Sequence, residues 1–524
     1  MTKPFCAQTV CSLLIALVSL GLSSCHSDAY YYYKFPQYTF ADRPVPPSKL
    51  ANRVLVGLTT NGSSSGALEM LDALRDIRST VQNPNATFTI SGFSEPYPSM
   101  IFNFPEEVHA YVYSPTGNVL QIVNYSTEAS AGSGGSFSGA ATSLAIPASA
   151  NHLYAAQQTI GQLGIIDNTT GKSYGLNLPN VTQVAVNQGD TVVLAMVRNS
   201  NTLYRVFKLN ANQYPTAPAA ISGTGSVDCQ PYNVPVYCVV PVPGNLPGAS
   251  ATANDYDRPI SAYFSLDGTT AYVLNCGAEC GGSTSSVSML QQGLLEVTVI
   301  PTTATQPTPV SAKVLVPGGA TVALAGTNSN TNAPTLYVAG QQLQPDGNFA
   351  GFLSTIDLGT NKVSGPYSIS DGNHSKILFG DDNTLWIGSQ YCATGERAYQ
   401  ASLGVTTQAA NYNCLTRVVL PSTTSPSLTA SVVPTVNKAS ASGATPVVAA
   451  VPVPYPNANN DQYYYGSLTG LCWVQGLHKM YTAYGGQVHA FNTADGSEIN
   501  NQYITVQGTA LDVAYMDATT DAAN

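Results

Sequence analysis

The chain has 524 residues, of which 44% are hydrophobic and only 9% are charged, and its formal net charge is −10. This apolar content is sufficient for a packed core, which argues against a disordered chain. An acidic chain with scattered Lys and Arg residues lacks the basic surface that nucleic acid requires, so we expect no nucleic-acid partner.

Residues 1–24 are typical of an export signal. Lys3 supplies a positive start, and the apolar run LLIALVSLGL at 13–22 is shorter than the roughly 20 residues that span a bilayer. The run ends in Leu22-Ser23-Ser24-Cys25, which resembles the signal of bacterial lipoproteins. The resemblance implies lipid on Cys25 and anchorage in the cell envelope. An ordinary secretory signal with a nearby cysteine is the alternative.

Residues 25–50 are predicted to form a tether. The residue after Cys25 is His26, and not the aspartate that the lipoprotein family associates with inner-membrane retention, so the resemblance favours the outer membrane, on its periplasmic or its outer surface. Four tyrosines at 30–33 and three prolines at 44–47 give no strand or helix period, and Pro-rich segments act as semi-rigid spacers. The tyrosines fit either a membrane interface or a contact with the folded domain.

An aromatic residue recurs at one position of a short turn-and-strand unit along the rest of the chain. Such a recurrence is typical of a repeat architecture. The six units read HAYVYS, HLYAAQ, TAYVLN, TLYVAG, TLWIGS and KMYTAY, and we expect their aromatics to be core residues: Tyr111, Tyr154, Tyr272, Tyr337, Trp386 and Tyr481.

Each unit is predicted to begin with a further strand, and eight such first strands are found. They are short β-branched or aromatic runs bounded by turn residues. The segment 66–78 fits a helical turn or a strand equally well. The predicted first strands are 99–104, 142–147, 182–187, 259–264, 320–325, 375–380, 468–474 and 510–516.

The two ends of the chain predict how the repeats close. RVLVGLTT at 53–60 reads as a second strand with no first strand before it, because the preceding RPVPPSKL contains prolines that cannot join a ladder. ALDVAYM at 510–516 is a first strand with no unit after it. Pairing of these two segments would close a ring and leave no open sheet edge. We therefore predict an all-β fold over 51–520, a β-propeller of eight blades, or of seven if one first strand is miscounted.

The units resemble the bacterial YVTN and WD-repeat-like propellers, a group that includes lactonase-like and quinoprotein-dehydrogenase-like rings. The resemblance is carried by AYVLN at 271–275, LYVAG at 336–340 and the turns IDNTTGK at 166–172 and IDLGTNK at 356–362. It specifies the fold far better than an activity. The units are uneven, with two expected inserts near 210–257 and 421–466 that are either functional loops or loosely ordered surface.

Seven cysteines remain after the signal is removed and Cys25 takes lipid. Disulfides are the expected state of cysteines in an exported chain. Proximity in sequence favours one set among about 105 arrangements. A metal site at the C-x-x-x-C pair lacks a second pair of ligands, and Cys472 is expected to be a buried thiol. The favoured pairs are Cys229–Cys238, Cys276–Cys280 and Cys392–Cys414.

The sequence offers no set of residues that predicts catalysis, and we expect no cofactor. His109 and His152 occupy a position that Thr takes in other units, which indicates a strand start. Two oxygen-rich turns fit calcium, although Asp and Asn also suit such turns on backbone grounds alone. These turns contain Asn254, Asp255 and Asp257, and Asp381, Asp382 and Asn383.

Three functions are consistent with these features. The first is a non-catalytic binding or scaffolding propeller, held to the membrane by its N-terminal lipid and bound to a protein or polysaccharide. The second is a lactonase-like or quinoprotein-like enzyme, which would need clustered polar groups at the central channel. The third is a structural envelope protein that assembles through its Thr- and Asn-rich exterior.

Overall fold

The computed structural model describes most of the chain from residue 43 onward. No helix in the described part is long and apolar enough to cross a membrane. The predicted signal, Cys25 and the tyrosine run lie outside the described residues. The described ranges are 43–60, 65–80, 83–209, 228–230, 237–250, 253–296, 308–345, 349–390, 392, 414–433, 467–499 and 504–520.

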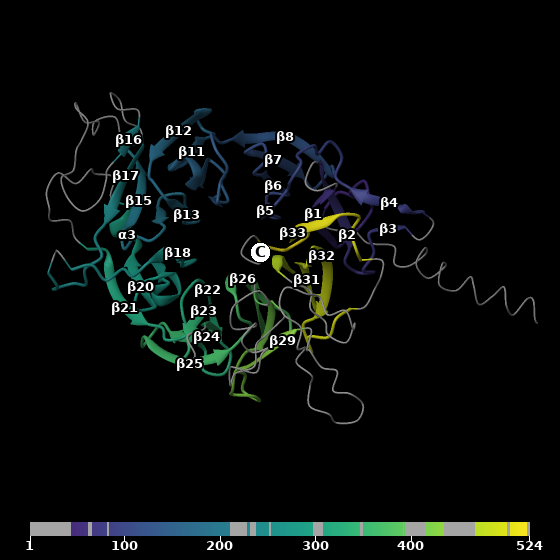
Figure 1. Ribbon diagram of the computed structural model, residues 1–524. Helices are drawn as coiled ribbons and strands as arrows, with labels where there is room; N and C mark the ends of the chain where they lie inside the picture. The colour runs from purple at the N-terminus through teal and green to yellow at the C-terminus, as the bar shows by residue number, and fades with distance from the viewer. Residues whose placement is uncertain are drawn as a thin grey trace, which may run out of the picture.

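Eight antiparallel sheets are arranged around a central axis, which makes the fold an eight-bladed β-propeller (Figure 1). The first four blades contain β1 (Arg53–Thr60), β2 (Ser65–Asp72), β3 (Ser79–Thr80), β4 (Asn83–Thr89) and the C-terminal β33 (Thr509–Tyr515); β5 (Met100–Phe104), β6 (His109–Ser114), β7 (Val119–Asn124) and β8 (Ala129–Ser136); β9 (Ser143–Ala145), β10 (His152–Gln157), β11 (Gln162–Asp167) and β12 (Lys172–Asn177); and β13 (Val181–Val186), β14 (Val193–Val197), β15 (Leu203–Lys208), β16 (Asp228–Gln230) and β17 (Tyr237–Val242).

The last four blades contain β18 (Pro259–Phe264), β19 (Thr270–Asn275), β20 (Ser286–Gln291) and β21 (Val310–Leu315); β22 (Val322–Asn328), β23 (Ala333–Leu343), β24 (Phe349–Asp357) and β25 (Lys362–Ser368); β26 (Asn373–Gly380), β27 (Thr384–Gln390), β28 (Leu415–Val419) and β29 (Thr429–Val433); and β30 (Leu468–Val474), β31 (Lys479–Tyr484) and β32 (Gln487–Asn492). Short helical turns are η2 (Gln158–Ile160), η4 (Gly277–Cys280) and α3 (Gln292–Leu295).

The second strand of a blade is buried on both of its faces. In β6, β10, β19 and β31 the first residue is partly exposed and the next five are buried. Side chains of a strand alternate between the two faces of its sheet, so burial of both sets requires a neighbouring blade on each side. The core of the ring therefore lies between the blades, in a series of separate apolar clusters.

All eight predicted first strands are present, and two of them, 259–264 and 468–474, have the predicted bounds. The segment 66–78 forms β2 followed by a turn, and not a helix.

The predicted inserts were too wide, because β17 and β29 fall inside them and belong to blades. Pro241 weakens the strand signal of β17, and β29 has only five residues between Ser- and Thr-rich neighbours. Residues 210–227, 231–236 and 434–466 lie outside the described part.

The predicted closure of the ring is confirmed. Strand β33 pairs antiparallel with β1, from Val54 opposite Tyr515 to Thr59 opposite Thr509, and becomes the innermost strand of the first blade. The last strand of the chain thus completes the blade that begins the ring (Figure 1).

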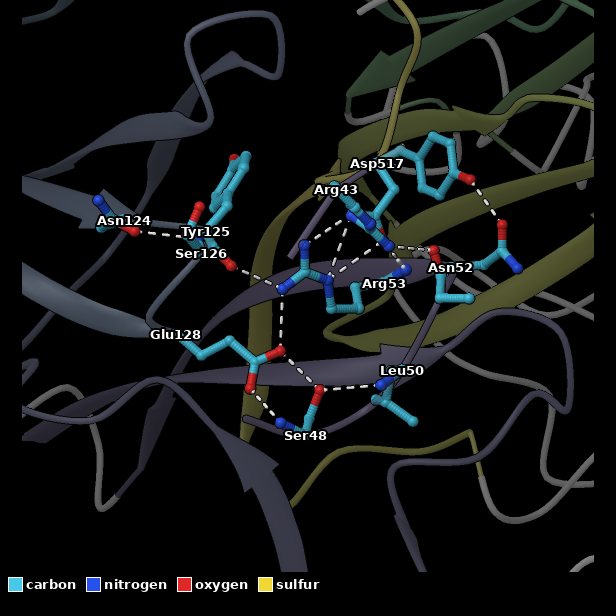
Figure 2. Close-up of polar contacts among 12 residues, drawn as sticks. Arg43, Ser48, Leu50, Asn52, Arg53, Asn124, Tyr125, Ser126, Glu128 and Asp517 are labelled. Atoms are coloured by element: carbon cyan, nitrogen blue, oxygen red, sulfur yellow. Dashed lines mark hydrogen bonds and ion pairs between the residues drawn. The ribbon is translucent and has the colours of Figure 1, made fainter. Parts of the chain in front are cut away.

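A buried arginine joins the two ends of the chain at this closure (Figure 2). The side chain of Arg53 is 2% exposed, and its Nη2 donates to Asp517 Oδ1 at 2.7 Å just beyond β33. Its Nη1 donates to Glu128 Oε1 at 2.9 Å and to the Tyr125 carbonyl at 2.7 Å, both in the second blade. Burial opposes the charged form, but the bonds and charges of Asp517 and Glu128 outweigh it and raise the pKa of Arg53 above its usual range.

The last residues of the predicted tether pack against the same cluster. Ser48 donates through its amide and its hydroxyl to Glu128, at 2.7 and 2.6 Å. Arg43 bonds Asp517 and the carbonyl of Ala51. Residues 43–50 of the predicted tether are therefore fixed to the ring, and its residues 25–42 lie outside the described part of the chain.

Replacement of Arg53 by Met should lower the free energy of unfolding by about 3–5 kcal/mol, because Glu128 would stay buried without its cation and Asp517 would keep only Arg43. Urea denaturation followed by fluorescence measures this change. Arg198 is exposed, so Arg198→Met is the matched control and should change stability by no more than about 0.5 kcal/mol. Equal losses in the two variants would contradict a role for Arg53 in closure.

Candidate functional site

The recurring aromatics lie on the second strands and fill the space between blades. All six side chains are buried, with Trp386 and Tyr481 fully enclosed. The Tyr154 hydroxyl donates to Asp190 Oδ1 of the next blade at 2.9 Å, and Tyr481 donates to Asp76 across the closure. These residues hold neighbouring blades together, and none of them is placed to act on a ligand.

Two disulfides follow second strands of different blades. Cys276 and Cys280 form one around η4, after β19, and Cys392 and Cys414 form another after β27. Cys229 and Cys238 are opposite each other in the register of β16 and β17, and Cys238 is disulfide-bonded. Cys472 is a buried free thiol, and burial raises its pKa.

The first two disulfides lie on one face of the ring. Glu279, in the Cys276–Cys280 loop, accepts hydrogen bonds from the amide and the Nε2 of Gln341 at the end of β23, both at 2.9 Å. Gln341 Oε1 accepts from the Gly372 amide at 3.3 Å. A Cβ on Gly372 would lie 2.9 Å from the Cα of Cys392. We call the surface formed by the two disulfides, Glu279, Gln341 and Gly372 the disulfide face.

Glu279 is a group of the disulfide face whose pKa is raised. Burial raises its pKa from 4.5 to about 6, although the two hydrogen bonds from Gln341 act in the opposite direction. The carboxylate joins the fifth blade to the sixth, and Gln341 joins the sixth to the seventh. Glu279 and Gln341 together thus connect three blades at the surface.

The central channel contains a cavity of about 410 Å³ on the axis of the ring. Its wall is formed by the inner strands β5, β22, β26, β30 and β33 and by Ile146. In this wall Lys376 Nζ lies 3.4 Å from Asp512 Oδ1. Lys376 is 38% exposed, whereas the side chain of Asp512 is 3% exposed.

Asp512 connects three blades inside the channel. Its Oδ2 accepts from the Ile101 amide of the second blade at 2.9 Å, and Lys376 reaches it from the seventh blade. Burial raises the pKa of Asp512, while Lys376 and the amides of Ile101 and Val513 act against that rise. Sequence reasoning missed this pair, although Lys376 and Asp512 are the only Lys, Arg, Asp or Glu residues in the eight innermost strands.

The first of the two oxygen-rich turns lies on the disulfide face. Asp257 Oδ2 accepts from the Ser283 amide and hydroxyl and from the Thr284 amide, at 2.6–2.8 Å. Although partial burial acts in the opposite direction, these bonds lower the pKa of Asp257. Asn254 bonds Asn201 and Tyr256, and Asp255 bonds the Leu246 amide.

The second oxygen-rich turn connects β26 to β27 on the opposite face. Asp381 accepts from the amides of Gly476 and His478, and Asp382 accepts from His478 and Thr493. Asn383 donates to the Leu420 carbonyl. Among the residues that the structure describes, no three His, Cys, Asp or Glu side chains are grouped to hold a metal ion.

Another polar cluster that sequence reasoning missed joins the third and fourth blades. His152 Nδ1 lies 2.5 Å from Asp190 Oδ2, and its Nε2 lies 3.6 Å from Asp167 Oδ2. Asp167 also accepts from Lys208 at 2.9 Å and from the Tyr237 hydroxyl at 2.8 Å. Burial acts to raise the pKa of Asp167, but these bonds and that of Thr169 outweigh it and lower the pKa. The cluster therefore stabilises the contact between the two blades.

Comparison with known proteins identifies the fold but no family. No family model matches the chain, and no curated protein matches its sequence. The dihydro-heme d1 dehydrogenase NirN, solved in complex with DHE, aligns with 93% of this chain and 83% of its own at 10% identity and a TM-score of 0.50. Hydrazine synthase of Kuenenia stuttgartiensis covers 76% and 96% at 10% identity and 0.41. A putative 6-phosphogluconolactonase of Bacteroides uniformis covers 88% and 99% at 12% identity and 0.39.

The chain is a β-propeller. At these identities the similarity extends to the fold alone, and the activities of the three proteins are not carried over to this chain.

The raised pKa of Glu279 predicts a pH dependence of stability. Because the folded protein binds this proton more tightly than the unfolded chain, Glu279 favours the folded state below about pH 4.5, and this contribution is lost as the pH rises to about 6. Glu279→Gln should lack the loss, and should therefore gain stability relative to the parent protein over that interval by at most about 2 kcal/mol.

Urea denaturation at a series of pH values measures the difference. Glu107 is exposed, and Glu107→Gln serves as the control at the surface. A parent and a Glu279→Gln variant whose stability curves run parallel from pH 4 to pH 7 would show that Glu279 is not buried against Gln341.

Proposed function

We propose that this protein is an exported, lipid-anchored β-propeller that binds a protein or polysaccharide of the cell envelope through its disulfide face, without catalysis. The observation that carries this proposal is the connection of the Cys276–Cys280 loop, through Glu279, Gln341 and Gly372, to the position of the Cys392–Cys414 disulfide, across three blades.

Rigidity at this face favours binding. A loop that is already ordered loses little conformational entropy when a partner binds, so more of the contact energy appears as affinity. The Cys276–Cys280 bond and the Asp257 hydrogen bonds fix the segment 276–284 before any partner arrives. The exposed residues of this segment include Ser283 and Thr284. The Ser283 hydroxyl donates to Asp257 and can still accept a hydrogen bond from a polar partner, whereas a threonine hydroxyl such as that of Thr284 can donate and accept.

Anchorage is supported by the sequence. Cys25 directly follows an apolar run and two small residues, and the disulfides fit an oxidising compartment outside the cytoplasm. One acyl chain binds a membrane only marginally, whereas two or three chains hold a protein firmly. We propose that the protein lies at the outer membrane, facing either the periplasm or the exterior.

Both other functions place different demands on the molecule. An enzyme of the lactonase or quinoprotein type needs polar groups free to react at the channel, whereas Asp512 is enclosed and engaged by Lys376 and two backbone amides. A structural envelope protein would need self-association. Calcium at the turns of Asp257 or Asp382 would be an accessory to any of the three functions.

The anchor is tested by mass spectrometry of the mature N-terminal peptide from the native host. The proposal predicts a triacylated or diacylated Cys25 and predicts that Cys25→Ser releases the protein from the membrane fraction. An unmodified Cys25 on a protein that still sediments with membranes would contradict it.

The binding face is tested by photo-crosslinking in the native host. A photoreactive residue at Thr284, which is exposed on the disulfide face, should give a discrete crosslinked product. The same residue at Thr360, exposed in the hairpin between β24 and β25 on the opposite face, is the matched control. Crosslinks from Thr360 alone would place the interaction on the other face, and ladders of the protein with itself from both sites would favour the structural function.

A further inference from the structure

The channel cavity has the size and the wall of a small-molecule site. Its volume of about 410 Å³ lies within the range of roughly 300–1,000 Å³ that such pockets occupy. Five large apolar side chains that line it keep part of their surface exposed, although they lie at the centre of the ring: Ile101, Phe102, Ile146, Val322 and Ile377. Covering apolar surface of this kind with a ligand is favourable, because it removes that surface from water.

One charged group in the wall is available to a ligand. Lys376 has three N–H donors, and within the described part of the chain its ammonium contacts only Asp512, at 3.4 Å. Asp512 is not available in the same way, because it is enclosed and its oxygens accept from the amides of Ile101 and Val513 as well as from Lys376. Among the charged groups of its wall, the site therefore offers a donor and not an acceptor.

The position of Ser375 shows that this part of the wall is open to solvent. Ser375 is exposed although it lies on the innermost strand β26, next to Lys376, and it lines the same cavity. A ligand with an apolar body of several carbons and one acceptor head could place its head at Lys376 and its body against the apolar wall.

We propose that the channel binds small amphipathic carboxylates, with the carboxylate on Lys376 and the hydrocarbon against Ile101, Phe102, Val322 and Ile377. An ammonium group bonds a carboxylate more strongly than a neutral acceptor. This inference does not depend on the binding function of the disulfide face.

Three eight-carbon probes with different heads test the chemistry of the site. In calorimetric titrations of the whole mature protein, octanoate should bind more tightly than octanol, and octylamine should bind weakest because its ammonium meets that of Lys376. A protein that binds none of the three, or binds octylamine best, would overturn the proposal.

Two variants test the position of the site. Lys376→Met keeps the length of the side chain and should weaken octanoate about 10- to 100-fold, the range expected for loss of a charge-assisted bond, with octanol affected little. Ser375→Leu fills the cavity from an exposed position and should abolish binding of both probes. The second variant keeps the test valid if loss of the Lys376–Asp512 pair unfolds the ring.

Matched controls are available on the outer strand β12, whose Lys172 and Ser173 are exposed and lie away from the cavity. Lys172→Met and Ser173→Leu should leave octanoate affinity unchanged. Octanoate binding that survives in Ser375→Leu would show that the probe binds elsewhere on the surface, and would also overturn the proposal. Photo-crosslinking from Thr284 is unaffected by either result.

Discussion

The whole ring depends on the pairing of the last strand with the first. Strand β33 is the inner neighbour of β1, and so removes an open sheet edge. Backbone hydrogen bonds of a sheet do not depend on the side chains, so they do not by themselves fix the register of β33 against β1. A specific side-chain contact is needed for that. Arg53 provides it, because its buried guanidinium is satisfied only when Asp517 and Glu128 both lie beside it. Such a cluster contributes more to choosing one arrangement than to net stability.

Strand β33 also carries a carboxylate that lies in the wall of the channel. Asp512 accepts a hydrogen bond from the second blade and is contacted by Lys376 of the seventh blade. The contacts of Asp512 in the channel and of Asp517 just beyond the end of β33 therefore both hold this strand in the ring. This arrangement explains why a channel with apolar walls contains one ion pair. It also leaves the ammonium of Lys376 as the more exposed member of the pair.

Much of the fold could be predicted from the sequence, because it rests on local signals. Tyr272 and Trp386 recur at one position of a strand, and the ends of the chain carry complementary strands. The fourth strands β17 and β29 were missed, since their residues resemble the surrounding loop. The polar clusters were missed for a different reason: Arg53 and Asp517 are 464 residues apart, and only the closed ring brings them together. The charged residues Lys376 and Asp512, by contrast, lie in two of the predicted first strands, which are otherwise uncharged, and this signal in the sequence could have identified the pair in the channel. The disulfide face depends on contacts between blades that spacing alone does not reveal.

Closure can be measured directly with a pair of cysteines across the seam of the ring. Val56 and Val513 are opposite each other in the register of β1 and β33 and share one buried cluster. In a Cys472→Ala background, which removes the free thiol of that cluster, Val56→Cys combined with Val513→Cys should oxidise to a disulfide that links the N-terminal and C-terminal peptides in a tryptic digest. Two free thiols after oxidation of the folded protein, or a disulfide to any other cysteine, would contradict the account.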